Sequence, residues 1–195
     1  MKVGLVLEKA LIVTSNKTSM SFFTEMLNMA SISNLTFCSN CLEARTYLAK
    51  DEYDYVIVNS PLKDEFGESL ARVTATNGFS QVILVVPTEH YNKILASKAN
   101  MDILVVSKPV NRANFWSALK LAKSVNQKVK RVQDENLKLK KQLQDVAVIN
   151  RAKCILISYL GMSEEEAHKY IEKQAMDVRQ TKRIVAEGIL KTYEY

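Results

Sequence analysis

The stretch "DYVIVNSPL", from Asp54 to Leu62, decides the fold of the first part of the chain. Its apolar run is flanked by polar residues, ends at Asn59 and turns at Ser60-Pro61, as a buried strand does. Four further β-branched runs resemble it, at residues 9–14, 34–38, 81–86 and 102–107. Near-continuous apolar runs of this kind are typical of parallel strands that are covered on both faces.

Amphipathic segments separate these runs. They predict helices at 17–30, 41–50, 66–76, 89–98 and from 111 onward. Strands that alternate with helices predict an α/β fold with a doubly wound parallel sheet, for which the flavodoxin-like order is a common solution. We therefore expect a functional site at the carboxyl ends of the strands.

The composition excludes several classes of protein. The chain has 195 residues, of which 47% are hydrophobic and 25% charged, enough for one ordinary domain and a smaller one. It has no run of about 18 apolar residues, and its first residues lack the pattern of a signal peptide. We therefore expect a cytoplasmic protein that does not enter a membrane.

The three cysteines allow two interpretations. Cys38 and Cys41 form a C-x-x-C motif, which could be a redox pair or half of a zinc site, and Cys154 stands alone. The only histidines, His90 and His168, form no cluster that would complete a metal site. We favour two small buried thiols and expect neither a metal nor a cofactor.

A heptad repeat runs from Phe115 to Asn150, a segment without proline or glycine. With Phe115 at position a, nine of the eleven a and d positions are apolar, which predicts a coiled-coil seam. Asn136 at a fixes register and favours a parallel dimer, in which Glu135 and Lys140 can pair between chains. The alternative is a lone helix that packs on its own domains. The expected dimer residues are Val125, Val129, Val132, Asn136, Leu139, Leu143 and Val146.

The last 45 residues predict a bundle of three helices. The long helix should end at Gly161, and Ser163 with Glu166 forms a capping box for the next one. A third helix is expected near Asp177, which has Gln180 at the same spacing. The expected core residues are Ala167, Tyr170, Ile171 and Ala175, then Ile184, Val185, Gly188 and Ile189.

Residues 8–123 resemble a response-regulator receiver domain. Lys108 precedes Pro109 after the fifth strand, and Gly67 follows Asn59 at the family's usual spacing. The resemblance implies a phosphoryl-accepting aspartate at the end of the third strand, acids that help to hold Mg²⁺, and a lysine that neutralises the phosphoryl charge.

The groups that carry this chemistry are missing. Asn59 replaces the aspartate, and its amide is a poor nucleophile and a weak metal ligand. We therefore expect a pseudo-receiver in which Lys108 bonds Asn59 or a neighbouring carbonyl, and we read Asp54 and Asp64 as ordinary turn or surface acids. The degenerate site comprises Thr14, Ser15, Asn16, Asn59, Thr88 and Lys108.

The end of the chain resembles an ANTAR domain, the RNA-binding output module of bacterial antiterminators. The matching motifs are "RAK" at 151–153, "LGMSEEEAH" at 160–168, "QAMD" at 174–177 and "VAEGIL" at 185–190. Cys154 stands where glycine is common. The resemblance implies binding of paired hairpins in nascent mRNA.

The residues themselves give a weaker RNA signal. The net charge of +6 is concentrated in residues 124–195, yet acids nearly balance bases at the very end. Each basic residue could equally belong to a solvated helix face, and Tyr170 could belong to the core. The expected RNA-binding residues are Arg151, Lys153, Lys169, Lys173, Gln174, Arg179, Lys182 and Arg183.

These predictions define three parts: a pseudo-receiver at 1–123, a coiled-coil linker at 124–147 and an ANTAR domain at 148–195. We expect a homodimeric antitermination regulator and not an enzyme. Its partners would be mRNA leader hairpins, with a regulatory protein or a small ligand on the pseudo-receiver. The alternative is a dimeric protein-binding signalling adaptor that binds no nucleic acid.

Overall fold

The computed structural model describes residues 8–97 and 102–193. The chain divides into two compact units, Met1–Lys130 and Arg131–Tyr195. The end predicted at residue 98 for the fourth helix lies outside the described residues.

A five-stranded parallel sheet forms the centre of the first unit. Its strands are β1 (Lys9–Val13), β2 (Asn34–Cys38), β3 (Tyr55–Asn59), β4 (Gln81–Val86) and β5 (Ile103–Ser107). The strand order β2-β1-β3-β4-β5 confirms the flavodoxin-like prediction. All four pairings are parallel, so the carboxyl ends of β1, β3 and β5 lie along one edge of the sheet.

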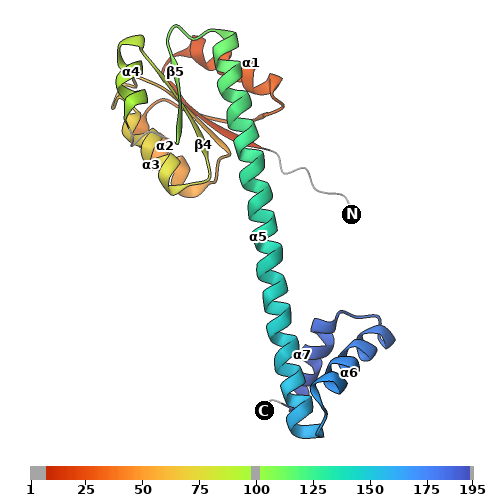
Figure 1. Ribbon diagram of the computed structural model, residues 1–195. Coiled ribbons are helices and arrows are strands. Elements are labelled where there is room, and N and C mark those ends of the chain that lie inside the picture. The colour runs from red at the N-terminus through yellow and green to blue at the C-terminus, as the bar shows by residue number, and fades with distance from the viewer. Residues whose placement is uncertain (1–7, 98–101, 194–195) are drawn as a thin grey trace. The chain divides into compact units, whose positions relative to one another are not determined.

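Helices cover both faces of this sheet (Figure 1). They are α1 (Lys17–Met29), α2 (Cys41–Lys50), α3 (Glu68–Asn77), α4 (Thr88–Ala96) and the first turns of α5 (Arg112–Leu160). Because side chains alternate along a strand, Leu11 and Val58 pack against α2, α3 and α4 on one face. Ile12 and Ile57 pack against α1 and α5 on the other face.

Gly67 shapes the loop that follows β3. Its φ of +96° lies in the left-handed region, and a Cβ there would come within 2.8 Å of Val58 Cγ1. Only glycine fits without strain, because other residues meet both a conformational and a steric penalty. The loop therefore closes tightly over the end of β3, and α3 begins at Glu68, two residues later than predicted.

The first turns of α5 complete the core of the receiver unit. Phe115, Leu119 and Ala122 are buried, and the ring of Phe115 contacts Phe22 and Phe23 at centroid distances of 5.6 and 5.1 Å. Phe115 and Ala122 were assigned to a coiled-coil seam by the heptad pattern. That assignment is wrong for these two residues, because their side chains are already covered within their own chain.

The second unit contains the end of α5, α6 (Glu164–Asp177) and α7 (Lys182–Tyr193). Gly161 ends α5 with a φ of +64°, and Ser163 and Glu166 form both hydrogen bonds of the capping box, so these two predictions are confirmed. The small core is centred on Ala152, Leu156, Ala167, Ile171 and Ala186.

Three details of this bundle differ from the prediction. Asp177 is the last residue of α6 and does not begin a new helix; α7 begins at Lys182, where Thr181 Oγ1 accepts a hydrogen bond from the Ile184 N–H. Tyr170 is 39% exposed, and Ile184 is also exposed. Ala186 takes the central position on α7, since it is fully buried.

No single helix in the described part of the chain is long and apolar enough to cross a membrane; only α5 and α6 taken together, across a bend of 116°, pass the test of length and composition.

Candidate functional site

The carboxyl ends of β1 and β3 bring Thr14 and Asn59 into contact. Both side chains are buried, and Asn59 Nδ2 donates a hydrogen bond of 3.0 Å to Thr14 Oγ1. A neutral hydrogen bond of this kind contributes about 1 kcal/mol to stability. The two side chains thus satisfy each other at the position that the sequence predicted for the site.

Lys108 reaches the same edge from the end of β5. Its Nζ donates to the carbonyl oxygen of Ser60 at 2.5 Å, which is the second of the two partners that the sequence suggested. Burial lowers the pKa of Lys108, because the charged ammonium group loses solvation there. Thr88 Oγ1 donates to the carbonyl of Lys108 and so fixes the start of α4 on this loop.

Ser15 and Asn16 lie beside this cluster but do not enter it. Both are exposed, and Asn16 caps α1 by accepting a hydrogen bond of 2.8 Å from the Thr18 N–H. Among residues 8–97 and 102–193, none of the hydrogen-bond partners of Thr14, Asn59 or Lys108 is a carboxylate. The site is therefore built from amides, hydroxyls, carbonyls and one lysine.

The two cysteines of the C-x-x-C motif are buried thiols. Burial raises the pKa of Cys38 to about 12 and that of Cys41 to about 11, so neither forms a thiolate at neutral pH. Asp64 and Glu65 lie near Cys41, but Asp64 accepts hydrogen bonds from the N–H groups of Cys41 and Leu42. Glu65 pairs with Arg45. These carboxylates hold the start of α2 in place.

Asp54 is not an ordinary surface acid, contrary to the prediction. It precedes β3, at the opposite end of the strands from Asn59, and its side chain is only 16% exposed. It accepts a hydrogen bond of 2.8 Å from the Lys9 N–H and pairs with Lys130 at 2.5 Å. The prediction failed because Lys130 is far from Asp54 in the sequence.

A groove of about 520 Å³ in the second unit contains two of the eight predicted RNA-binding residues, Lys169 and Lys173. Leu160 at the end of α5 and the loop residues Gly161 and Met162 form one wall. Glu166, Lys169, Tyr170 and Lys173 of α6 form the other wall. These four residues follow the spacing i, i+3, i+4, i+7 and therefore share one face of the helix. Basic side chains beside an exposed aromatic ring are the groups that contact phosphates and stack on unpaired bases.

The charged side chains along this groove differ in whether they are already paired within the protein. Lys169 pairs with Glu165 at 2.6 Å on the exposed surface of α6. Lys173 has no ion-pair partner within residues 8–97 and 102–193. Glu166 is engaged in the capping box, where the N–H of Ser163 holds its pKa below the usual value. The carboxylates of Glu165 and Glu166 offset much of the positive charge here, and Lys173 is the more available of the two lysines. The wall at 160–162 was not predicted as part of a site, although the motif "LGMSEEEAH" at 160–168 begins with these residues.

Three of the other predicted RNA-binding residues connect helices. Lys153 on α5 is largely buried and pairs with Glu164 at 3.1 Å, and Lys182 on α7 pairs with Glu172 of α6. Arg183 pairs with Asp145 of α5 at 2.5 Å and also with Glu187. These contacts link the helices of the bundle, so substitutions at Lys153, Lys182 and Arg183 would lower its stability as well as change its charge.

The remaining predicted residues lie outside the groove. Arg151 is exposed on α5, and Gln174 is half-buried on α6. Arg179 is exposed in the turn between α6 and α7, where its φ is 53°. The structure thus separates the eight predicted residues into a groove pair, Lys169 and Lys173, and six that lie elsewhere.

The predicted dimer residues beyond the receiver core are mostly uncovered. Val129 is half-buried and Asn136 Nδ2 donates to the carbonyl of Val132 in its own helix at 3.0 Å. The exposed members are Val125, Val132, Leu139, Leu143 and Val146. Large apolar side chains that recur along one helix without cover are characteristic of an interaction surface.

Comparison with known proteins identifies the second unit. Residues 137–190 match the ANTAR domain family. The matched segment begins eleven residues before the boundary predicted at 148. The transcriptional regulatory protein PdtaR of Mycobacterium tuberculosis is 25% identical over 139 residues, which is 71% of this chain and 68% of that protein. The aliphatic amidase regulator of Pseudomonas aeruginosa is 26% identical over 86 residues, which is 44% of each.

Solved structures define the fold of the first unit. A signal receiver domain from Pseudomonas fluorescens Pf-5 superposes with a TM-score of 0.56 and 22% identity, covering 67% of this chain and 98% of that domain. The BeF3-activated DrrB receiver domain gives a TM-score of 0.51 with 18% identity, covering 60% and 98%. The chain combines a receiver fold with an ANTAR domain and is related to these two regulators. It is a regulatory protein and not an enzyme.

Proposed function

We propose that this protein is an RNA-binding regulator of transcription antitermination. The observation that carries the proposal is the groove on α6, in which Lys169, Tyr170 and Lys173 face solvent inside the segment that matches the ANTAR domain. In this mechanism the domain binds paired hairpins in a nascent mRNA leader. The bound hairpins prevent an overlapping terminator from forming, so the polymerase continues. Contact with nascent RNA also places the protein in the cytoplasm.

Two ANTAR domains would act together. The uncovered residues from Val125 to Val146 follow a heptad repeat, and the polar Asn136 in the repeat favours a parallel pair of helices. A second copy of the chain would cover these residues and bring one ANTAR domain to each hairpin. Tethering raises the effective concentration of the second domain, so two hairpins bind much more tightly than one.

The receiver unit would work as a pseudo-receiver. Asn59 cannot accept a phosphoryl group as an aspartate does, and Thr14 supplies a hydroxyl where a carboxylate would help to hold Mg²⁺. Lys108 is already bonded to the carbonyl of Ser60. Control of the output would then come from a regulatory protein or a small ligand on this unit.

Phosphorylation of the receiver unit is expected to fail. Incubation with a small-molecule phosphodonor and Mg²⁺ should leave the intact mass of the protein unchanged, because both the nucleophile and the metal-binding acids are missing. Asn59→Asp alone should also stay unmodified, since Thr14 and Ser15 remain. A receiver that keeps its acids serves as the positive control. One added phosphoryl group that base releases from the wild-type protein would contradict the pseudo-receiver.

Antitermination itself is tested by single-round transcription across a terminator whose stem overlaps the second of two hairpins. The RNA should come from transcripts that co-purify with the protein from its own cell. Readthrough should rise with added protein and should not rise on a template in which the first hairpin is deleted. If readthrough stays constant on the RNA that binds best, antitermination is wrong. If no cellular RNA is enriched, the dimeric protein-binding adaptor replaces the proposal.

A further inference from the structure

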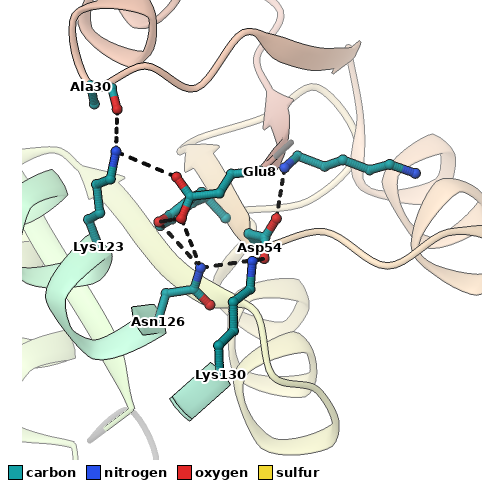
Figure 2. Close-up of polar contacts among 8 residues, drawn as sticks. Glu8, Ala30, Asp54, Lys123, Asn126 and Lys130 are labelled. Carbon is teal, nitrogen blue, oxygen red and sulfur yellow. Dashed lines mark hydrogen bonds and ion pairs between the residues drawn. The ribbon is translucent and has the colours of Figure 1, made fainter. Parts of the chain in front are cut away.

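A second polar cluster lies at the amino ends of the strands, away from Asn59 (Figure 2). Glu8 immediately precedes β1 and Asp54 immediately precedes β3, so both residues lie at the amino ends of these neighbouring strands. Three residues of α5 approach them at helical spacing. We call the set the base cluster; its members are Glu8, Asp54, Tyr55, Lys123, Asn126 and Lys130.

Polar side chains of α5 contact polar side chains at the ends of β1 and β3 in the base cluster. Lys123 pairs with Glu8 at 3.5 Å and also donates to the carbonyl of Ala30, while Lys130 pairs with Asp54 at 2.5 Å. Asn126 lies between them and is almost fully buried. Its Nδ2 is 3.4 Å from Glu8 Oε1, 3.4 Å from Asp54 Oδ1 and 3.3 Å from the hydroxyl of Tyr55.

The charges in this cluster are only partly accessible to solvent. The side chains of Glu8 and Asp54 are less exposed than those of the two lysines, at 17% and 16% against 28% and 38%. Burial acts to raise the pKa of Asp54, but hydrogen bonds from Lys130 and from the Lys9 N–H outweigh it and hold the pKa below its usual value. The ion pair with Lys130 therefore offsets much of the cost of burying the Asp54 carboxylate.

The attachment of α5 changes in character within this region. Phe115, Leu119 and Ala122 hold the helix on the receiver through apolar packing. Among the described residues, that core includes no residue of α5 after Ala122, whereas Asn126 and Lys130 form hydrogen bonds and an ion pair. The two N–H groups of Asn126 Nδ2 face three acceptors at 3.3–3.4 Å, so these contacts are weak. The polar attachment of this part of the helix comes mainly from its two ion pairs and from the bond of Lys123 to the carbonyl of Ala30. Segments held in this way open locally more easily than the core beside them.

We propose that the base cluster is a latch that decides where α5 leaves the receiver unit. When the latch is closed, the two turns from Lys123 to Lys130 belong to the receiver. When it is open, these turns are released as free helix while Phe115 stays in the core. Release also lengthens the free heptad segment that a second copy can cover, so that it includes Val129; this consequence rests on the proposed dimer. A ligand or protein that competes for Glu8 or Asp54 would open the latch.

Hydrogen exchange of the full-length protein tests the latch. Lys130→Met leaves Asp54 without its cation, so amides in residues 123–130 should exchange about tenfold faster than in the wild type. Amides of the strands and of residues 150–190 should keep their wild-type rates. Arg131→Met is the matched control, because it removes one positive charge from the neighbouring position on α5. In the described part of the chain, the only ion pair of Arg131 is an exposed one with Glu135.

A second substitution separates charge from packing. In Asp54→Asn with Lys130→Met the stranded charge is gone but the ion pair is absent too, so exchange in residues 123–130 should be slower than in Lys130→Met and still faster than in the wild type. Unchanged exchange in Lys130→Met would overturn the latch, and so would equal acceleration across the whole receiver unit, which would show general destabilisation. These rates decide the latch even if RNA binding or dimerisation fails.

Discussion

Replacing Leu139 with lysine is expected to turn a dimer of this protein into monomers. Leu139 occupies a d position of the heptad repeat and is 58% exposed in the single chain, so the substitution leaves the fold of each copy intact. In a parallel dimer, two lysines would meet in one layer of the seam. Buried like charges without partners cost several kcal/mol, so the dissociation constant should rise about 100-fold or more.

Leu137 provides a matched control for this experiment. It is 65% exposed on the same helix but lies outside the a and d positions, so Leu137→Lys should leave the dimer intact. Sedimentation velocity at micromolar concentration distinguishes the two variants. A wild-type protein that sediments as a monomer, or equal dissociation of both lysine variants, would remove the heptad seam as the interface.

The orientation of the helices needs a separate measurement. Leu139→Cys in a Cys154→Ser background should form a disulfide between copies under mild oxidation, because like d positions face each other in a parallel pair. Cys38 and Cys41 are buried and do not compete. Absence of the crosslink in a protein that is dimeric would show an antiparallel arrangement, in which one pair of ANTAR domains could not reach two adjacent hairpins.

The sheet could be predicted from the sequence almost to the residue. Each of the five apolar runs became a strand with ends that differ by at most one residue from the prediction. The reason is that a parallel sheet covered on both faces needs continuous apolar strands, which stand out against polar loops. Lys108 and Gly67 were also placed correctly, since the positions of both are set by their distance from a strand end.

The heptad register could not be assigned correctly at its start. Phe115 and Ala122 fit a repeat of 3.5 residues, but they also fit the 3.6-residue face that α5 turns toward its own sheet. The two patterns diverge by only about 20° per heptad, so the first two heptads satisfy both. Which partner covers these side chains depends on the tertiary fold, which leaves no mark in the local sequence.

The base cluster and the ion pairs of the ANTAR domain were missed for a related reason. Asn126 and Tyr55 are 71 positions apart, and Asn126 in a polar helix resembles a solvated residue. Likewise, Lys153 and Arg183 resemble free cations in the sequence. In the structure α6 brings Glu164 beside Lys153, and α7 places Arg183 beside Asp145 of α5. Polar contacts between distant segments carry no periodic signal, so only the three-dimensional structure separates structural cations from those that face solvent.

This separation leads to the second large effect, the loss of RNA binding on substitution of the groove lysines. Lys169→Ala with Lys173→Ala removes two cations from each copy without touching an ion pair between helices. Each phosphate contact contributes about 0.7–0.9 to the salt dependence, so a dimer on two hairpins should lose about 3 from its log–log slope. Affinity at physiological salt should fall about 100-fold. Filter binding across a salt series measures both quantities.

Two comparisons decide whether the groove itself is the interface. Lys138→Ala with Lys141→Ala removes the same charge from an exposed face of α5, and it should leave the slope almost unchanged. Tyr170→Ala should weaken binding by about tenfold or more, whereas Tyr170→Phe keeps the ring and should bind nearly as the wild type, because stacking on a base contributes about 1–3 kcal/mol. Equal losses in both lysine pairs would mean that the RNA is held by diffuse charge and not by the groove. Equal binding by Tyr170→Ala and the wild type would remove base stacking from the mechanism, since the exposed ring would then contact no base.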